Sequence, residues 1–176
     1  MIKKNWVGFV FAFLVPILVV LFWWGAFNRT DIRETRSEPV HYAYTDFFGD
    51  LGAIADAQEK VRGMLVAARI QPGSPIVVLY TDPRNTRKTE QHARVGYEIA
   101  PGTAVPEPLR LDDIPARNVL RASVQASMQL APSKAYQALF DYLRPQGRDI
   151  RLPTVEIYTA GHSVSQMGTL TVDMAD

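Results

Sequence analysis

The sequence contains no cysteine and carries almost no net charge. Without cysteine the chain has no disulfide, no thiolate nucleophile and no zinc site with sulfur ligands. Its 19 basic and 18 acidic residues leave a formal net charge of +1 at pH 7. Proteins that bind nucleic acid usually carry a clear basic excess, so we expect no nucleic-acid partner. What remains is an ordinary globular composition, 47% hydrophobic and 21% charged over 176 residues, enough for one domain.

Histidine is also scarce, and none of its three copies has the spacing of a metal site. They lie far apart, each near an expected strand end or loop: His41, His92 and His162. No serine stands in a recognisable arrangement with a histidine and an acid, so a serine-hydrolase mechanism has no support. We therefore expect no metal, no cofactor and no catalytic residue of these types.

One long apolar run is present at the N-terminus. "WVGFVFAFLVPILVVLFWWGAF", residues 6–27, carries no charge and has about the 20 residues that a helix needs to cross a hydrocarbon core. Trp23 and Trp24 stand where an interfacial aromatic belt would lie. A cleaved signal peptide is the alternative, but the apolar run is long for one and no small-x-small cleavage site follows it. Residues 1–27 are therefore predicted to be an uncleaved, single-pass membrane anchor.

The charges on either side of this run bear on its orientation. Lys3 and Lys4 favour a cytoplasmic N-terminus, whereas three arginines compete from the other side: Arg29, Arg33 and Arg36. A short tail with paired lysines usually stays inside, so the balance favours a periplasmic domain on the bacterial inner membrane.

The rest of the chain is predicted to be a short tether followed by two similar halves. Residues 28–38, "NRTDIRETRSE", are polar without periodicity and are expected to be the tether. Within 39–176, "PIVVLYT" at residue 75 is repeated as "PTVEIYT" at residue 153, an offset of 78. The same offset relates two helical patterns, Ala57, Val61 and Leu65 in the first and Ala135, Leu139 and Leu143 in the second.

Each half is predicted to contain a strand, a helix and two further strands. In the first half the strands are 40–47, 75–81 and 93–99, and the helix follows Asp50 and stops at "QPG", 71–73. In the second half the strands are 117–125, 153–159 and 167–174, and the helix is 132–147. A proline-rich segment, 101–116, links the halves. The expected fold is α+β: a duplicated β-α-β-β unit with two main helices on one side of an antiparallel sheet, preceded by one transmembrane helix.

Glu156 is a charged residue inside the apolar strand 153–159, and its counterpart at the offset of 78 is Val78. Alternation along the strands predicts two sets of side chains. The set expected beneath the helices is Val77, Leu79, Val155 and Ile157, and the set on the opposite face is Val78, Tyr80, Glu156 and Tyr158. That opposite face would form a groove with tyrosine walls and one carboxylate, suited to a cationic or polarised apolar ligand. The alternative is a solvated face, on which a glutamate needs no explanation.

Three segments together resemble a known family. "VLYTDPRNTRKTEQHARVGYEI", "AYQALFDYL" and "PTVEIYT" are similar, in order, to the GyrI-like small-molecule-binding domains, which include effector-binding domains of AraC-type and multidrug-sensing regulators. The resemblance implies a duplicated β-α-β-β fold whose groove binds small hydrophobic or cationic molecules. It also implies that Glu156 is the acidic determinant of the pocket, with aromatic walls around it. Tyr80, Tyr158 and Tyr97 are the candidates for those walls, with Val78 between them.

The chain departs from that family in two ways. Its regulators carry a helix-turn-helix, for which residues 28–38 are too short, so we expect no transcriptional control by this chain alone. One branch resembles the others in fold but hydrolyses strained toxins with an acidic pocket residue. The second helix of the family often has Trp where Tyr142 stands here, which weakens the hydrolase interpretation.

The sequence therefore favours a membrane-anchored binding domain for a small amphipathic or cationic molecule. Two alternatives stay open: a hydrolase that uses Glu156 as acid or base, and an adaptor whose groove takes a protein partner. The aromatic residues of the second helix, Tyr136, Phe140 and Tyr142, are expected to be core and boundary residues rather than ligand contacts.

Overall fold

The computed structural model describes residues 5–161 and 167–175. His162, one of the residues considered above, lies outside this part of the chain. The elements in chain order are α1 (Asn5–Trp23), β1 (Asp31–Arg36), β2 (Val40–Phe48), α2 (Ile54–Ala67), β3 (Pro75–Leu79), β4 (His92–Glu98), β5 (Arg110–Ile114), β6 (Asn118–Gln125), α3 (Ala131–Leu143), β7 (Thr154–Thr159) and β8 (Thr169–Ala175). Three short 3-10 helices complete them: η1 (Leu51–Ala53), η2 (Lys88–Glu90) and η3 (Arg144–Gln146).

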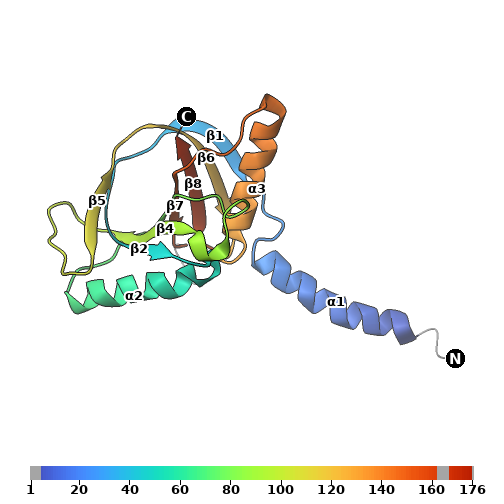
Figure 1. The fold of residues 1–176 in the computed structure, drawn as a ribbon. Helices are drawn as coiled ribbons and strands as arrows, with labels where there is room; N and C mark the ends of the chain where they lie inside the picture. Colours follow the sequence, from blue (N-terminus) through green and yellow to red (C-terminus); the bar gives the residue numbers. More distant parts are fainter. Residues whose placement is uncertain (1–4, 162–166, 176) are drawn as a thin grey trace.

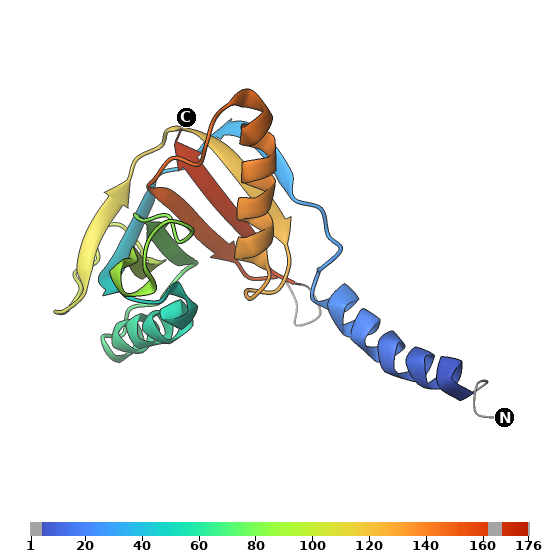
Figure 2. The ribbon, with the colours of Figure 1, turned by 45° about the vertical axis from the view of Figure 1, so that its right-hand side comes forward.

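The described strands form one antiparallel sheet in the order β1-β6-β8-β7-β3-β4-β2-β5 (Figure 1). Strands β7 and β3 are the central pair, and β2-α2-β3-β4 on one side of it corresponds to β6-α3-β7-β8 on the other. Helices α2 and α3 lie on the same side of the sheet (Figure 2). The predicted α+β fold with a duplicated unit and two main helices is confirmed.

The two edge strands were not expected from the sequence. Strand β1 lies within the segment predicted to be a tether, and β5 lies within the proline-rich link. Each strand pairs with the half that is more distant in sequence: β1 with β6, and β5 with β2. The tether prediction is therefore wrong for residues 31–36. Polar and charged side chains are common on edge strands, which leave one side unpaired, and such strands lack an apolar signal.

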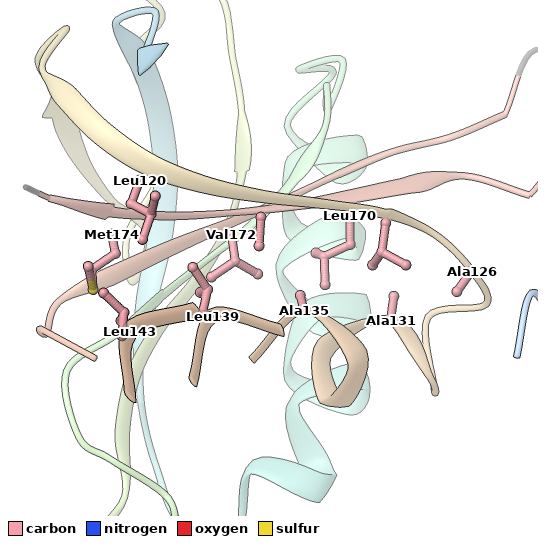
Figure 3. Packing of buried hydrophobic residues seen from close by; sticks show 11 residues of the cluster. Leu120, Ala126, Ala131, Ala135, Leu139, Leu143, Leu170, Val172 and Met174 are labelled. Carbon is pink, nitrogen blue, oxygen red and sulfur yellow. The ribbon is translucent and has the colours of Figure 1, made fainter. Parts of the chain in front are cut away.

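Helix α3 packs on the second half of the sheet through residues spaced four apart. Ala131, Ala135, Leu139 and Leu143 face Leu120, Leu170, Val172 and Met174 of β6 and β8 (Figure 3). Helix α2 packs in the same way on the first half through Val61 and Leu65. Of the three pairs of helical positions that the offset of 78 relates, two are fully buried in both halves, Val61 with Leu139 and Leu65 with Leu143.

The offset that relates the helices fails in the central strands. Val77, and not Val78, lies directly opposite Glu156 in the antiparallel pair of β3 and β7. Because paired residues share a face, Glu156 and Tyr158 lie on the helix side of the sheet with Val77. The expectation that Glu156 faces away from the helices is therefore wrong. A displacement of one residue transfers every side chain of a strand to the other face.

The face opposite the helices is packed rather than solvated. Val78 and Val155 are buried there together with Tyr42, Tyr44 and Ile76. The Arg94 guanidinium lies 4.5 Å from the ring centre of Tyr44 and 5.2 Å from that of Tyr80, and it hydrogen-bonds Asp112. These contacts fill the face with side chains of the chain itself.

Helix α1 projects away from the sheet (Figure 1). Among the residues that the structure describes, no helix is long and apolar enough to cross a membrane. The transmembrane part of the predicted fold is therefore not supported.

Candidate functional site

A cavity of about 940 Å³ lies between α2, α3 and the centre of the sheet. Its floor comes from the two central strands, through Val77 and Leu79 of β3 and Glu156 and Tyr158 of β7. Its sides come from the N-terminal half of α2, from α3 and from the loop that follows β3. The cavity therefore sits on the junction of the two halves, where helices on the two flanks leave the sheet uncovered.

The two halves give this cavity walls of different character. The first half contributes mainly aliphatic side chains, Leu51, Ile54, Val77 and Leu79. The second half contributes hydroxyl, amide, aromatic and carboxyl groups, among them Ser133, Tyr136, Gln137, Phe140, Glu156 and Tyr158. The cavity is therefore amphipathic. Both halves contribute apolar side chains, the aromatic rings and Glu156 come from the second half, and Gln58, Asp82 and Arg84 are polar residues of the first half.

Glu156 is held in the cavity by a short hydrogen-bond chain. The Tyr136 hydroxyl donates to Glu156 Oε1 at 2.7 Å, and the same hydroxyl lies 2.7 Å from Thr154 Oγ1. Thr154 is fully buried. Since the Tyr136 proton points to the carboxylate, the threonine hydroxyl is the donor in the second contact. These hydrogen bonds fix both the position and the orientation of the Glu156 carboxyl group.

Burial changes the acidity of this pair. Loss of solvation raises the pKa of Glu156 from its ordinary value of 4.5 to about 7, although the Tyr136 hydrogen bond acts in the opposite direction. The pKa of Tyr136 is itself held well above its usual range, first by burial and then by the neighbouring Glu156 charge. Glu156 therefore exchanges its proton near neutral pH, and a cation in the cavity would favour the charged form.

The other charged groups in the cavity wall already have partners. The Arg84 guanidinium contacts Asp82 at 2.7 Å and Asp149 at 3.1 Å, and it lies 5.2 Å from the ring centre of Phe140. Hydrogen bonds from Arg84 hold the pKa of Asp82 below its ordinary value. Within residues 5–161 and 167–175, no basic side chain forms an ion pair with Glu156. Its negative charge is therefore the one in the cavity wall that a ligand could neutralise.

The structure brings together two of the five predicted ligand-binding residues. Glu156 and Tyr158 line the cavity. Val78 and Tyr80 lie on the other face of the sheet, where Tyr80 stacks on His92 with ring centres 4.9 Å apart. Tyr97 is buried under α2 with the core of the first half and is not part of the cavity wall. Ligand binding by these residues stays a prediction.

Most of the cavity residues were not identified from the sequence as ligand contacts, among them Tyr136, Phe140 and Gln58. Tyr136 and Phe140 were expected to be core or boundary residues, but both line the cavity, whereas Tyr142 is an exposed residue. They form an i, i+4 aromatic pair beside the buried stripe of α3, which is the signal that identifies them in retrospect. Gln58 is a polar residue on the inner side of α2, and its Nε2 donates to the Gly96 carbonyl at 3.3 Å.

In the described part of the chain, no group of three or more histidine, aspartate or glutamate side chains is arranged to hold a metal ion. His41 and His92 instead contact carboxylates of the sheet, Asp113 at 2.6 Å and Asp46 at 3.1 Å.

The sequence matches no family model and no curated protein. Several solved structures match the fold. The EcmrR C-terminal domain aligns with a TM-score of 0.64 at 11% identity, over 83% of this chain and 96% of that one. EcmrR in a complex with DNA gives 0.64 at 10% identity, and the alignment spans 83% of this chain but only 57% of EcmrR. SAV2435 bound to tetraphenylphosphonium gives 0.59 at 9% identity, over 83% of this chain and 94% of that one.

Likenesses at such low identity show the fold. This chain shares its fold with the EcmrR C-terminal domain and with SAV2435.

Proposed function

We propose that this protein binds a small amphipathic or cationic molecule in the cavity between α2 and α3. One observation carries the proposal: a cavity of about 940 Å³ contains the Glu156 carboxyl group, which has no basic partner among the described residues. That volume lies within the usual range of small-molecule sites. Tyr136, Phe140 and Tyr158 offer ring faces near the carboxylate, and cations are attracted to both.

The amphipathic wall sets the orientation of such a ligand. Its positive charge would lie beside Glu156 and the aromatic rings of the second half, and its apolar body would lie against Leu51 and Ile54 of the first half. The structure of SAV2435 with tetraphenylphosphonium supports the use of that lipophilic cation as a probe for this fold.

Charge neutralisation makes the binding pH-dependent. A cation binds the deprotonated carboxylate, so its affinity should rise as pH increases through the Glu156 pKa of about 7 and level off above it. In the opposite direction, a bound cation should lower that pKa because it stabilises the charged form.

The test is equilibrium dialysis of the full-length protein in mild detergent, with free tetraphenylphosphonium read by a selective electrode. At pH 8 we expect saturable binding that is about 30-fold weaker, or more, in Glu156→Gln, since removing one partner of a buried charge pair costs about 2 kcal/mol or more. Glu98→Gln, which neutralises an exposed glutamate of β4, is the matched control and should bind normally. Equal affinity in Glu156→Gln, or no saturation in the unchanged protein, would contradict the proposal.

Attachment to a membrane through residues 1–27 is the second part of the proposal. It is supported by the large apolar side chains that α1 exposes, among them Trp6, Phe9, Phe13 and Phe22. Such a surface is unfavourable in water and marks a contact with lipid or with another apolar partner. We place the protein at the bacterial inner membrane, with the sheet domain on the periplasmic side.

Fractionation tests this part. The full chain should remain with membranes after a carbonate wash, whereas a chain that begins at residue 28 should be released. Because the protein has no cysteine, a single Glu59→Cys substitution on the exposed side of α2 gives a unique label. A periplasmic domain predicts reaction with an impermeant maleimide in cells whose inner membrane is intact. A full chain found in the soluble fraction would contradict the attachment.

A hydrolase is the second candidate, and the acidity of Glu156 favours it. A carboxyl group whose pKa is about 7 can accept and return a proton at neutral pH, as general acid–base catalysis requires. Turnover of a strained electrophile that disappears in Glu156→Gln would support the enzyme. Saturable binding without turnover would support the binding protein.

A further inference from the structure

The C-terminal end of α1 is tied to one end of the cavity. The backbone N–H of Ser127 donates to the Trp24 carbonyl at 3.0 Å, and Asn28 Nδ2 donates to the Gln125 carbonyl at 2.6 Å. The Lys134 ammonium of α3 donates to the Ala26 carbonyl, also at 2.6 Å. Together these bonds join α1 to the turn between β6 and α3 and to the first turn of α3. Figure 2 shows this end of α1 to the lower right of the start of α3.

Gly25 makes this junction close-packed. Its φ of +72° is a conformation that favours glycine, and a Cβ atom there would lie only 2.6 Å from the Gln125 carbonyl oxygen. The helix end therefore approaches the turn more closely than any larger residue would allow. The position of α1 relative to the sheet domain is set by contact rather than by a loose connection.

The same turn forms the α1 end of the cavity wall. Met128, Gln129, Pro132 and Ser133 line the cavity, and Met128 is half exposed. A second hollow of about 480 Å³ lies between the α1–β1 connection and α3, lined by Asn28, Arg29 and Lys134. Ser133 and Gln137 line both hollows. A continuous stretch of α3 therefore leads from the end of α1 to the chamber that contains Glu156.

The surface of α1 is apolar on every side. Ile17, Leu18, Val19 and Val20 are consecutive and 41–56% exposed, and four residues complete more than one helical turn of about 3.6 residues. A helix that docks in a protein groove needs only one apolar stripe and keeps a polar face, whereas one that is apolar all round is typical of lipid surroundings. The occupant that fits this surface is lipid.

We propose that the cavity takes its ligand directly from the lipid phase around α1, through the end lined by Met128 and Pro132. The proposal rests on the cation binding and the membrane attachment proposed above. It narrows the ligand to cations that partition into membranes, as opposed to cations confined to water. The contacts of residues 24–28 hold the end of α1 beside the turn that contributes Met128 and Pro132 to the cavity wall, and this end is the entrance that we propose. An entrance at this place shortens the path of a membrane-dissolved ligand to Glu156.

The experiment compares loading rates in phosphatidylcholine vesicles. In one variant a 20-residue Gly-Ser segment is inserted between Trp23 and Trp24, so that α1 and the domain are both kept but α1 is no longer held by the contacts of residues 24–28. The same insertion after Gly102, in the exposed connection between β4 and β5, is the control. Binding of tetraphenylphosphonium is followed by stopped-flow intrinsic fluorescence, with the free aqueous cation held constant by electrode.

We expect the junction insertion to slow loading several-fold and the control insertion to leave it unchanged. The dissociation constant, calculated from the free concentration of the cation in water, should be the same in all three proteins. The path by which a ligand enters changes the rate of binding and not its equilibrium constant. Equal loading rates in the junction variant and the unchanged protein would overturn the lipid route. Absence of saturable binding in all three would instead overturn the cation-binding function.

A second measurement needs no altered protein. Alkyltriphenylphosphonium ions with methyl to decyl chains carry the same charge but partition increasingly into lipid. At one aqueous concentration, the loading rate of the unchanged protein in vesicles should rise with the membrane concentration of the ion. A rate that follows the aqueous concentration alone across this series would overturn the proposal.

Discussion

The two halves of the molecule have the same core but different cavity walls. Val61 and Leu65 in α2 are buried as completely as Leu139 and Leu143 at the equivalent positions of α3. On the neighbouring stripe of each helix, which faces the cavity, the equivalence ends: Leu51 corresponds to Gln129, Ala55 to Ser133 and Gln58 to Tyr136. Packing constrains the buried stripe in both halves, whereas the cavity stripe is free to differ.

This difference between the two walls favours one orientation of a bound ligand. A symmetric pair of walls would bind a symmetric ligand, or bind an amphipathic one in two orientations. Here the second half supplies Glu156 and the aromatic rings, and Glu156 lies directly opposite Val77 of the first half across the central strand pair. The charged groups of the first half, Asp82 and Arg84, pair with each other. The charge of a ligand and its apolar body are thereby directed to opposite flanks of one chamber.

The shared core predicts equal losses from equivalent truncations. Leu65→Ala and Leu143→Ala each remove a fully buried side chain, and each should lower the free energy of unfolding by about 3–4 kcal/mol through lost burial and a residual cavity. Urea denaturation of the full chain in mild detergent, followed by circular dichroism, measures both.

Val66→Ala, at an exposed position of α2, is the control for this pair and should change the free energy by less than about 0.5 kcal/mol. A large loss in one half and almost none in the other would show that the two cores are not equivalent.

Glu156 should reduce the stability of the second half at high pH. Its folded pKa of about 7 lies above its ordinary value of 4.5, so the folded chain holds more protons than the unfolded chain between these values. The free energy of unfolding therefore falls as pH rises from 4.5 to 7, by up to about 3 kcal/mol. Glu156→Gln removes this charge, so it should raise the melting temperature at pH 8 and change it little at pH 4.5.

Thermal melts of the unchanged protein, Glu156→Gln and Glu98→Gln at pH 4.5 and pH 8 test whether the Glu156 charge destabilises the fold. Glu98→Gln should follow the unchanged protein at both. A lower melting temperature for Glu156→Gln at pH 8 would mean that the carboxylate stabilises the fold, contrary to its burial without a basic partner.

The Tyr136 hydroxyl affects the pKa of the Glu156 carboxylate to which it donates a hydrogen bond. Its hydrogen bond lowers the Glu156 pKa, so Tyr136→Phe should raise that pKa further and move the pH midpoint of cation binding upward. A hydrogen bond to a charged group contributes about 1.5 kcal/mol, so we expect a displacement of about one pH unit and about fivefold weaker binding at pH 7. Titrations with tetraphenylphosphonium from pH 6 to 9 measure it.

Tyr142→Phe removes a hydroxyl from an exposed position of the same helix and should leave the binding profile unchanged. If Tyr136→Phe leaves the pH midpoint in place, the hydroxyl does not act on Glu156 during binding.

Apolar periodicity was sufficient to predict the helices, the inner strands and the duplication. It was insufficient to predict which face the central strands present. "PIVVLYT" and "PTVEIYT" match closely, yet Tyr80 faces the packed side of the sheet and Tyr158 faces the cavity. The sequence match fixes local composition, but strand pairing decides the face, and a displacement of one residue is invisible in two such similar strings.

Other features escaped prediction for other physical reasons. Strand β1 is charged because it lies at an edge, so it has no apolar alternation to detect. Tyr136 and Phe140 lie on the border of the α3 stripe, where an aromatic residue can pack in a core or line a cavity. Only the position of α2 across the sheet decides between these two environments, and helical periodicity carries no information about that position.

The smallest expected effect concerns the ion pair that connects the halves at the surface. Arg84, in the loop after β3, contacts Asp149 of the second half at 3.1 Å, and their side chains are 41% and 64% exposed. Solvent screens such a pair and Asp82 still holds the arginine, so Asp149→Asn should lower the free energy of unfolding by less than about 1 kcal/mol. Melts in low and high salt, with Asp141→Asn on the exposed side of α3 as control, should show that the difference disappears when salt is added. A loss that is larger and persists in salt would contradict the view that the halves are joined by the pairing of β3 with β7 and differ in the cavity alone.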